Sequence, residues 1–343
     1  MKKHQKQSKL EFNMLQFSII VPVYNRPDEV DELLDSLTRQ TIKQFEVIIV
    51  EDGSTITCEE VVRKYEARLD VHYYTKSNSG PGQTRNYAAE RSNGQYLLIL
   101  DSDVIVPDTY LEAINEELQR EEADAFGGPD RAHHSFSDTQ KAINYAMTSF
   151  FTTGGIRGGK VKMDKFYPRS FNMGVRREVY EALGGFSKMR FGEDIDFSIR
   201  IFDAGYRCRL FPEAWVWHKR RTDLKKFFKQ VHNSGIARIN LYKKYPKSLK
   251  LVHLLPAAFT IGAALLVLGS PIVVYGPSLL LLYALMVMVD SSIQNKSLKI
   301  GSLSIVASFV QLIGYGTGFL RAWWQRCVRG KDEFEAFKKN FYK

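Results

Sequence analysis

The first part of the chain alternates unbroken apolar runs with segments whose apolar residues are spaced three and four apart. Such runs predict buried strands, here at 17–25, 45–52, 71–76 and 96–100. Between these strands, helices are predicted at 26–40, where apolar residues have the spacing of one helix face, and near 57–68. A loop followed by a helix is predicted within 80–94.

The same alternation continues beyond the fourth strand. Further elements are predicted as a helix from 109 to about 122, a strand within 123–129, a strand and short helix within 169–184, a helix over 193–205, and one or two closing strands within 208–221. Unbroken apolar strands that alternate with helices are typical of a mostly parallel sheet with helices on both faces. The predicted fold class is therefore α/β, with its ligand site at the carboxyl ends of the strands.

The C-terminal part contains apolar stretches long enough to cross a membrane. No Asp, Glu, Lys or Arg occurs in the 39 residues from Leu251 to Val289, which is about two helical spans at ~20 residues each. A third stretch, at 300–320, is diluted by serines, a glutamine and four glycines. The predicted membrane helices are 251–269, 271–289 and 300–320.

Positive charge is concentrated before the first apolar stretch. The formal net charge is +10, and within 219–250 only Asp223 opposes the lysines and arginines. A basic segment beside a membrane helix indicates contact with anionic membrane lipids on the cytosolic side, rather than with nucleic acid. The N-terminus is basic but lacks a long apolar core, so we predict no secretory signal. The α/β domain is expected on the cytosolic side of the cytoplasmic membrane.

These patterns divide the chain into five predicted parts. They are a flexible basic N-terminus at 1–16, an α/β domain at 17–221, a basic juxtamembrane segment at 222–250, membrane helices within 251–320 and a basic interfacial tail at 321–343. The three cysteines are scattered without a CxxC spacing, so neither a zinc site nor a disulfide framework is predicted.

Two carboxylates, Asp101 and Asp103, follow the fourth strand, and Asp52 ends the second. Like charges this close repel each other, so a cation is expected to offset them. Hard cations bind carboxylate oxygens and complete their shell with substrate phosphates. Two alternatives remain: a turn cap, and an aspartyl phosphatase of the haloacid-dehalogenase type that uses Asp101 as nucleophile. That motif usually ends the first strand of its domain, whereas here it ends the fourth.

A second acidic group, Glu193 and Asp194, follows a glycine and opens a helix, whose N-terminus favours the carboxylate form. Asp194 suits the role of general base, and Asp196 the role of stabilising the first turn. His218 is either a cation ligand or part of the basic segment. The run "GGIRGGK" at 154–160 imitates a phosphate-binding loop, but Val161 replaces the required Ser or Thr and no strand precedes it, so we predict a loop without that function.

These motifs together resemble a family. "IIVPVYNR", "EDGST", "GPGQTRNYA", "LLILDSDVIV", "FNMGVRREVYEALGGF" and "FGEDIDFSIRIFDAGYR" occur in this order and spacing, which is similar to family-2 inverting glycosyltransferases of the GT-A fold, over about 17–221. The basic segment and apolar tail look like the membrane-anchored members that build exopolysaccharide or lipid-linked glycans. The resemblance implies a Rossmann-like domain that binds a nucleotide-diphospho-sugar, with UDP as the expected nucleotide, and Mn²⁺ or Mg²⁺.

The resemblance also implies roles for single residues. Asp194 would take the proton from the acceptor hydroxyl, and Asp103, with His218 as a further candidate, would bind the metal. Glu193 and Asn172 are expected on the acceptor side, where a glycan or a polyprenyl-linked glycan would bind. The nucleotide-sugar would contact residues along the strand ends, namely Pro22, Tyr24, Asp52, Arg85, Asp101 and Asp103.

One departure from the family concerns processivity. Processive synthases carry a QxxRW motif after the acidic pair, and this chain has none there; we therefore expect transfer of a single sugar. Three full spans would put the tail outside the cell, so we expect 300–320 to be re-entrant or interfacial. A non-catalytic membrane scaffold that binds nucleotide-sugars remains the other alternative.

Overall fold

The computed structural model describes residues 16–131, 133, 135–153, 166–189, 191–269 and 275–332. The chain divides into two compact units. The sheet unit holds the described residues of Met1–Arg131 and Lys165–His218, and the helical unit holds those of Ala132–Asp164 and Lys219–Glu335. The run 154–160, nearly all of the predicted N-terminal part and the end of the tail lie outside the described residues.

The sheet unit is built on a seven-stranded sheet in the order β3-β2-β1-β4-β8-β6-β9. Its strands are β1 (Phe17–Val23), β2 (Phe45–Asp52), β3 (Val71–Lys76), β4 (Tyr96–Leu100), β6 (Ala125–Gly127), β8 (Asn172–Arg176) and β9 (Cys208–Leu210). The four predicted N-terminal strands are all present and mutually parallel. β8 runs antiparallel to β4 and β6, so the sheet is mostly but not wholly parallel.

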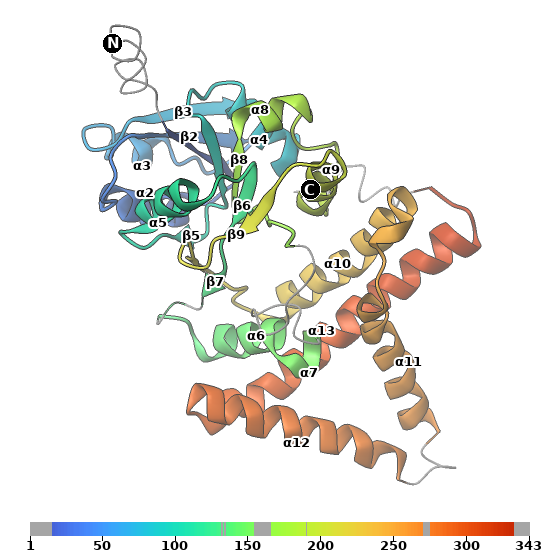
Figure 1. Ribbon diagram of the computed structural model, residues 1–343. Coiled ribbons are helices and arrows are strands. Elements are labelled where there is room, and N and C mark those ends of the chain that lie inside the picture. The colour runs from blue at the N-terminus through green and yellow to red at the C-terminus, as the bar shows by residue number, and fades with distance from the viewer. Residues whose placement is uncertain are drawn as a thin grey trace, which may run out of the picture. The chain divides into compact units, whose positions relative to one another are not determined.

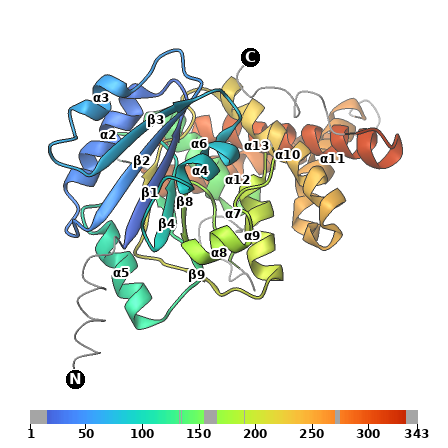
Figure 2. The ribbon, with the colours of Figure 1, turned by 90° about the horizontal axis from the view of Figure 1, so that it is seen from above.

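Helices cover both faces of this sheet (Figures 1 and 2). One face packs against α2 (Pro27–Thr38), α3 (Glu59–Arg63) and α5 (Tyr110–Arg120), and the other against α4 (Pro81–Ala89), α8 (Arg177–Ala182) and α9 (Glu193–Asp203). Successive strand residues alternate between the two cores: Ile19 and Val21 belong to the first, Ile20 to the second. The predicted α/β class, with a sheet buried on both faces, is confirmed.

A second, small sheet begins just after the carboxyl end of β4. It has the order β5-β10-β7, from β5 (Val104–Ile105), β10 (Val216–His218) and β7 (Asp130–Arg131). β10 runs antiparallel to β5, with His218 opposite Val104. The strand that closes the unit therefore returns beside the residues that follow β4.

The helical unit is organised around one long helix. α13 (Leu298–Trp323) packs against α6 (Asp138–Thr148), α10 (Leu224–Lys244), α11 (Leu255–Leu268) and α12 (Gly276–Asn295) (Figure 1). The remaining elements of the unit are short: α7 (Phe150–Thr153), η1 (Pro246–Ser248), η2 (Leu251–His253) and η3 (Trp324–Val328). Within the part of the chain that the structure describes, two helical stretches could cross a membrane by length and composition, Gly276–Asn295 and Leu298–Val328, whereas α11 is shorter.

Two glycines of α13 mark its crossings with α12 and α11. A Cβ added to Gly301 would lie 1.9 Å from Ser292 Oγ in α12, and one on Gly316 would lie 2.1 Å from Thr260 Oγ1 in α11. Close approach of backbones at small residues is typical of packed apolar helices. The 300–320 segment lies within the unbroken helix α13, and its expected re-entrant or interfacial placement stays a prediction.

Candidate functional site

The acidic residues predicted from the sequence gather at the carboxyl edge of the sheet. Asp52 is the last residue of β2, and Asp101 and Asp103 follow β4. Asn172 starts β8 and pairs with Leu100, the last residue of β4. Because β8 is antiparallel, its first residue reaches the same edge as the ends of the parallel strands.

Asp101, Asp103 and His218 form a group of candidate metal ligands. One ligand atom from each residue lies within 4.8 Å of the others, and His218 Nε2 is 3.2 Å from Asp103 Oδ1. The imidazole stacks on Phe171, with ring centroids 4.8 Å apart. Two carboxylates and one imidazole, all partly exposed, suit Mn²⁺ or Mg²⁺ with further positions left for substrate oxygens.

Arg85 connects this group to the second acidic pair. Its side chain is 3% exposed, with Nη2 donating to Asp101 Oδ1 at 2.8 Å and Nη1 donating to Glu193 Oε1 at 3.0 Å. Burial alone would lower the pKa of this guanidinium, but the two carboxylates raise it. A buried charge between two acids is a fixed bridge, so the end of β4 and the start of α9 are held together.

Asp194 is the second residue of α9 and lies in its first turn; the residue before the helix is Gly192, with a φ of +82°. Its Oδ1 accepts from the Ile195 N–H at 2.8 Å, and its Oδ2 accepts from Arg169 Nε at 2.6 Å. Burial would raise the pKa of Asp194, but the Arg169 charge holds it below its ordinary value. This carboxylate is therefore ionised at neutral pH.

Glu193, its neighbour, has the opposite shift. Its burial, reinforced by the charge of Asp194, raises its pKa to about 7, against the influence of Arg85. The pKa values of these two adjacent acids are thus shifted in opposite directions, which is frequent in active sites. The side chain points to Arg85, and its predicted place on the acceptor side stays a prediction.

Asp52 is engaged by the loop that follows β3. Its Oδ1 accepts from Lys76 Nζ at 2.5 Å and from the Ser79 N–H at 2.8 Å, and its Oδ2 accepts from the Gly80 N–H at 2.8 Å. The residue is 2% exposed. Asp52 thereby fixes the loop before α4, and its predicted contact with the nucleotide stays a prediction.

Pro22 and Tyr24 lie at the end of β1 and just beyond it, and both are half-buried. The sequence reasoning missed the next residue, Asn25, whose φ is +53°. Its Oδ1 accepts from the Thr55 and Ile56 N–H groups at 2.8 and 2.9 Å. Asn tolerates this left-handed conformation, and the "YN" at the strand end was the available signal.

Asn172 is used inside the fold. Its Oδ1 accepts from Tyr110 Oη at 2.7 Å, its Nδ2 donates to the Ala214 carbonyl at 2.8 Å, and the residue is 3% exposed. These bonds join α5, β8 and the segment before β10. They give Asn172 a structural role, and its predicted acceptor role stays a prediction.

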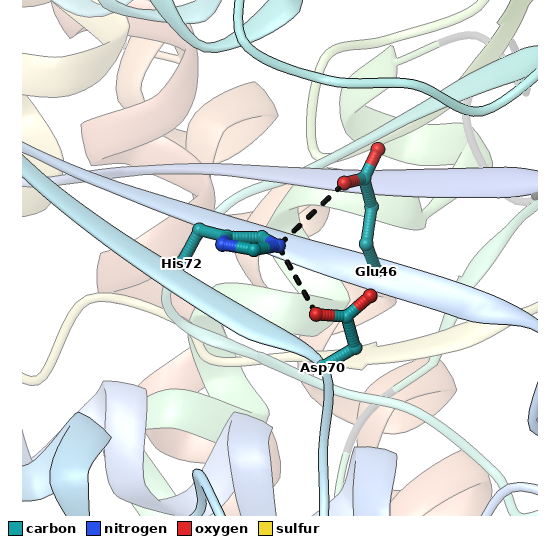
Figure 3. Close-up of side chains that lie close together, drawn as sticks. All are labelled: Glu46, Asp70 and His72. Atoms are coloured by element: carbon teal, nitrogen blue, oxygen red, sulfur yellow. Dashed lines mark ion pairs between the residues drawn. The ribbon is translucent and has the colours of Figure 1, made fainter.

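A second group of ligand-type side chains lies at the start of β2 and β3 (Figure 3). His72 Nε2 is 3.1 Å from Asp70 Oδ1 and 3.8 Å from Glu46 Oε2. Glu46 is fully buried and accepts from Ser18 Oγ at 2.6 Å and Asn93 Nδ2 at 3.1 Å. These bonds tie the turn before β4 to the sheet, so we read the group as structural.

Comparison with known proteins shows what the sheet unit is similar to. Residues 18–184 match the model of glycosyl transferase family 2. An uncharacterized glycosyltransferase of Bacillus subtilis, EpsJ, is 27% identical over 208 residues, covering 57% of this chain and 59% of that protein. The poly(ribitol-phosphate) beta-N-acetylglucosaminyltransferase TarS of Staphylococcus aureus is 39% identical over 94 residues, covering 26% of this chain and 16% of TarS.

A solved structure covers more of the chain. The mannosyltransferase PcManGT from Pyrobaculum calidifontis, in complex with GDP-Man and Mn²⁺, superposes with a TM-score of 0.65 at 17% identity, covering 91% of this chain and 88% of that one. This likeness concerns the fold. A Rickettsia conorii relative is matched over only 24% of its length, so this chain spans a small part of some curated relatives.

Proposed function

Since residues 18–184 form a glycosyltransferase family 2 domain on a GT-A fold, we propose that the protein transfers a single sugar from a nucleotide-diphospho-sugar to an acceptor hydroxyl with inversion. The observation that carries the proposal is one bridge. Arg85 joins Asp101, in the candidate metal group, to Glu193, next to the ionised Asp194. A donor diphosphate and a general base would thus meet at one edge of the sheet.

The proposed step needs one base. Asp194 accepts the proton of the acceptor hydroxyl while the hydroxyl oxygen forms a bond to the anomeric carbon. On the opposite side of that carbon, the bond to the diphosphate oxygen breaks, and the nucleoside diphosphate leaves with the electron pair. Displacement in one step inverts the anomeric centre. The depressed pKa of Asp194 keeps the base ionised before the acceptor binds.

Asp103 and His218, with Asp101 beside them, are the residues that would hold Mn²⁺ or Mg²⁺. A divalent cation there would supply positive charge to the leaving diphosphate. UDP is the expected nucleotide from the family resemblance, whereas PcManGT was solved with GDP-Man. Pro22, Tyr24, Asp52 and Arg85 complete the proposed donor site.

The proposed acceptor is a glycan or a polyprenyl-linked glycan at the cytosolic face of the cytoplasmic membrane. Support comes from the apolar stretches Gly276–Asn295 and Leu298–Val328 and from the basic helix α10. The absence of QxxRW after the acidic pair favours single additions over polymer synthesis. The division of the chain into an α/β domain, a basic segment, membrane helices and an interfacial tail is part of this proposal.

The decisive test replaces the base. Asp194→Asn keeps the shape of the side chain but removes the proton acceptor, so we expect turnover to fall by at least about a hundredfold, within the range of general-base contributions. Donor binding, measured by thermal shift with a panel of nucleotide-sugars and Mn²⁺, is expected to persist. A variant that keeps full turnover would exclude Asp194 as the general base. Donor binding without any sugar transfer by the wild-type protein would favour the non-catalytic scaffold.

Asp103→Ala serves as the matched control on the donor side. It is expected to abolish the metal-dependent part of donor binding, which EDTA also removes in the wild type. The phosphatase alternative, with Asp101 as nucleophile, is overturned by the family match and by the fold.

A further inference from the structure

The proposed base is held by an arginine that has more donors than the base uses. Arg169 donates through Nε to Asp194 Oδ2 at 2.6 Å. Among the residues that the structure describes, this is its one side-chain hydrogen bond, which leaves both Nη groups available. The Arg169 side chain is 39% exposed, whereas that of Asp194 is 11% exposed. Nε of the guanidinium therefore holds the base, and the side chain as a whole is partly exposed to solvent.

The position of Arg169 is built into the fold. The Arg169 carbonyl accepts from the Asn172 N–H at 3.0 Å, and the preceding Pro168 carbonyl accepts from Ser198 Oγ at 2.9 Å. Ser198 belongs to α9, the same helix that carries Asp194. These two hydrogen bonds fix the backbone of Arg169 beside the base. The Arg169–Asp194 pair therefore differs from a surface ion pair between long, mobile side chains.

The pair has a consequence for catalysis by Asp194. When this carboxylate accepts a proton, it becomes neutral and the ion pair with Arg169 is lost. The other acids whose charge acts on Arg169 are Glu193 and Asp130. Glu193 is bound to Arg85, and Asp130 lies 3.9 Å from His218 Nδ1. Proton transfer is therefore opposed by Arg169 unless a new anion binds its Nη groups.

We infer that Arg169 is an acceptor-binding residue that recognises a phosphate or carboxylate group lying beside the attacking hydroxyl. The planar guanidinium fork matches the oxygens of either anion. An anionic acceptor pairs with Arg169 and so weakens the ion pair between Arg169 and Asp194 when Asp194 has to accept a proton. A neutral acceptor leaves that ion pair at full strength. This inference rests on the proposed function for the role of Asp194, and it adds the chemical class of the acceptor.

Anion binding tests the inference without knowledge of the natural acceptor. The full chain in detergent, with Mg²⁺ and saturating UDP, is titrated with inorganic phosphate and separately with acetate, and binding is read by thermal shift. Asp194→Asn removes the competing charge, so we expect the affinity for at least one of the two anions to rise about tenfold. Arg169→Gln in the Asp194→Asn background is expected to abolish that gain.

Arg176→Gln is the matched control, because Arg176 is a similarly exposed arginine of the sheet unit whose Nη2 is paired with Glu122 at 3.5 Å. It is expected to leave anion binding unchanged. Tightening with phosphate alone indicates a phosphate-bearing acceptor, and tightening with acetate alone a carboxylate-bearing one. Equal affinities in Asp194→Asn and in the double variant would overturn the inference. That result leaves the proposed function standing, since the turnover of Asp194→Asn and the donor binding of Asp103→Ala are measured separately.

Discussion

Two neighbouring carboxyl groups in this protein have opposite pKa shifts because their charged surroundings differ. Arg169 is paired with Asp194 and holds its pKa down, whereas the equally buried Glu193 has its pKa raised to about 7 by burial and by Asp194, despite Arg85. Chemical type and sequence position are nearly the same, so the surroundings alone set the difference.

The raised pKa of Glu193 predicts a pH-dependent stability. Its pKa is about 7 in the folded protein against an ordinary value of 4.5, so the folded state binds more protons between these values. The free energy of unfolding therefore falls as pH rises from about 5 to 7. Glu193→Gln removes this group, and its melting temperature should fall less over the same window. Parallel melting curves against pH would contradict the prediction.

At the scale of elements, glycines decide how the helices of the helical unit pack. A Cβ on Gly318 of α13 would lie 2.0 Å from the His232 carbonyl in α10, and one on Gly235 of α10 would lie 2.2 Å from the Tyr315 carbonyl in α13. The two helices therefore approach each other with backbone against backbone along this crossing. Read as sequence, Gly318 only dilutes the apolar stretch 300–320.

Gly318→Ala is accordingly expected to destabilise the protein by about 1–3 kcal/mol, because a backbone carbonyl has to move to admit the new methyl group. Gly262→Ala in α11 is the matched control, since nothing lies within 4 Å of the added Cβ there. The control should be neutral or stabilising by up to about 1 kcal/mol through helix propensity. Thermal unfolding in detergent measures both, and a similar loss in the two variants would refute the role of the crossing.

At the scale of the whole molecule, the helical unit carries large exposed apolar side chains. Leu265, Leu281 and Ile293 are 66%, 70% and 72% exposed, on α11 and α12. Apolar surface of this extent usually marks contact with a membrane or a partner. α11 has 14 residues, fewer than the ~20 that a span requires. Two spans, α12 and α13, would return the tail to the side from which the chain entered.

This count predicts a cytosolic tail. In a Cys327→Ser background, a cysteine introduced by Lys331→Cys should react with a membrane-impermeant maleimide only after the cells are opened. Lys296→Cys, in the turn between α12 and α13, should react in intact cells. Efficient labelling of the Lys331→Cys variant in intact cells would exclude the two-span arrangement.

The sequence alone determined the elements and most of the edge chemistry. Strand runs, helix faces, the Asp101–Asp103 pair and the Glu193–Asp194 pair are local patterns, because side-chain periodicity and turn chemistry act over a few residues. The carboxyl ends of parallel strands then meet by the rule of the fold. The candidate site was therefore visible before the structure.

Only the tertiary structure decided which side chains meet across the chain. His218 reaches Asp103 because β10 returns antiparallel to β5, and Arg85 and Arg169 come from different segments to face Glu193 and Asp194. No local period encodes such contacts, since they depend on the packing of elements distant in sequence. The same limit hid the bonds that occupy Asn172 inside the fold. The charges came from the sequence, and the pairing that sets their chemistry came from the fold.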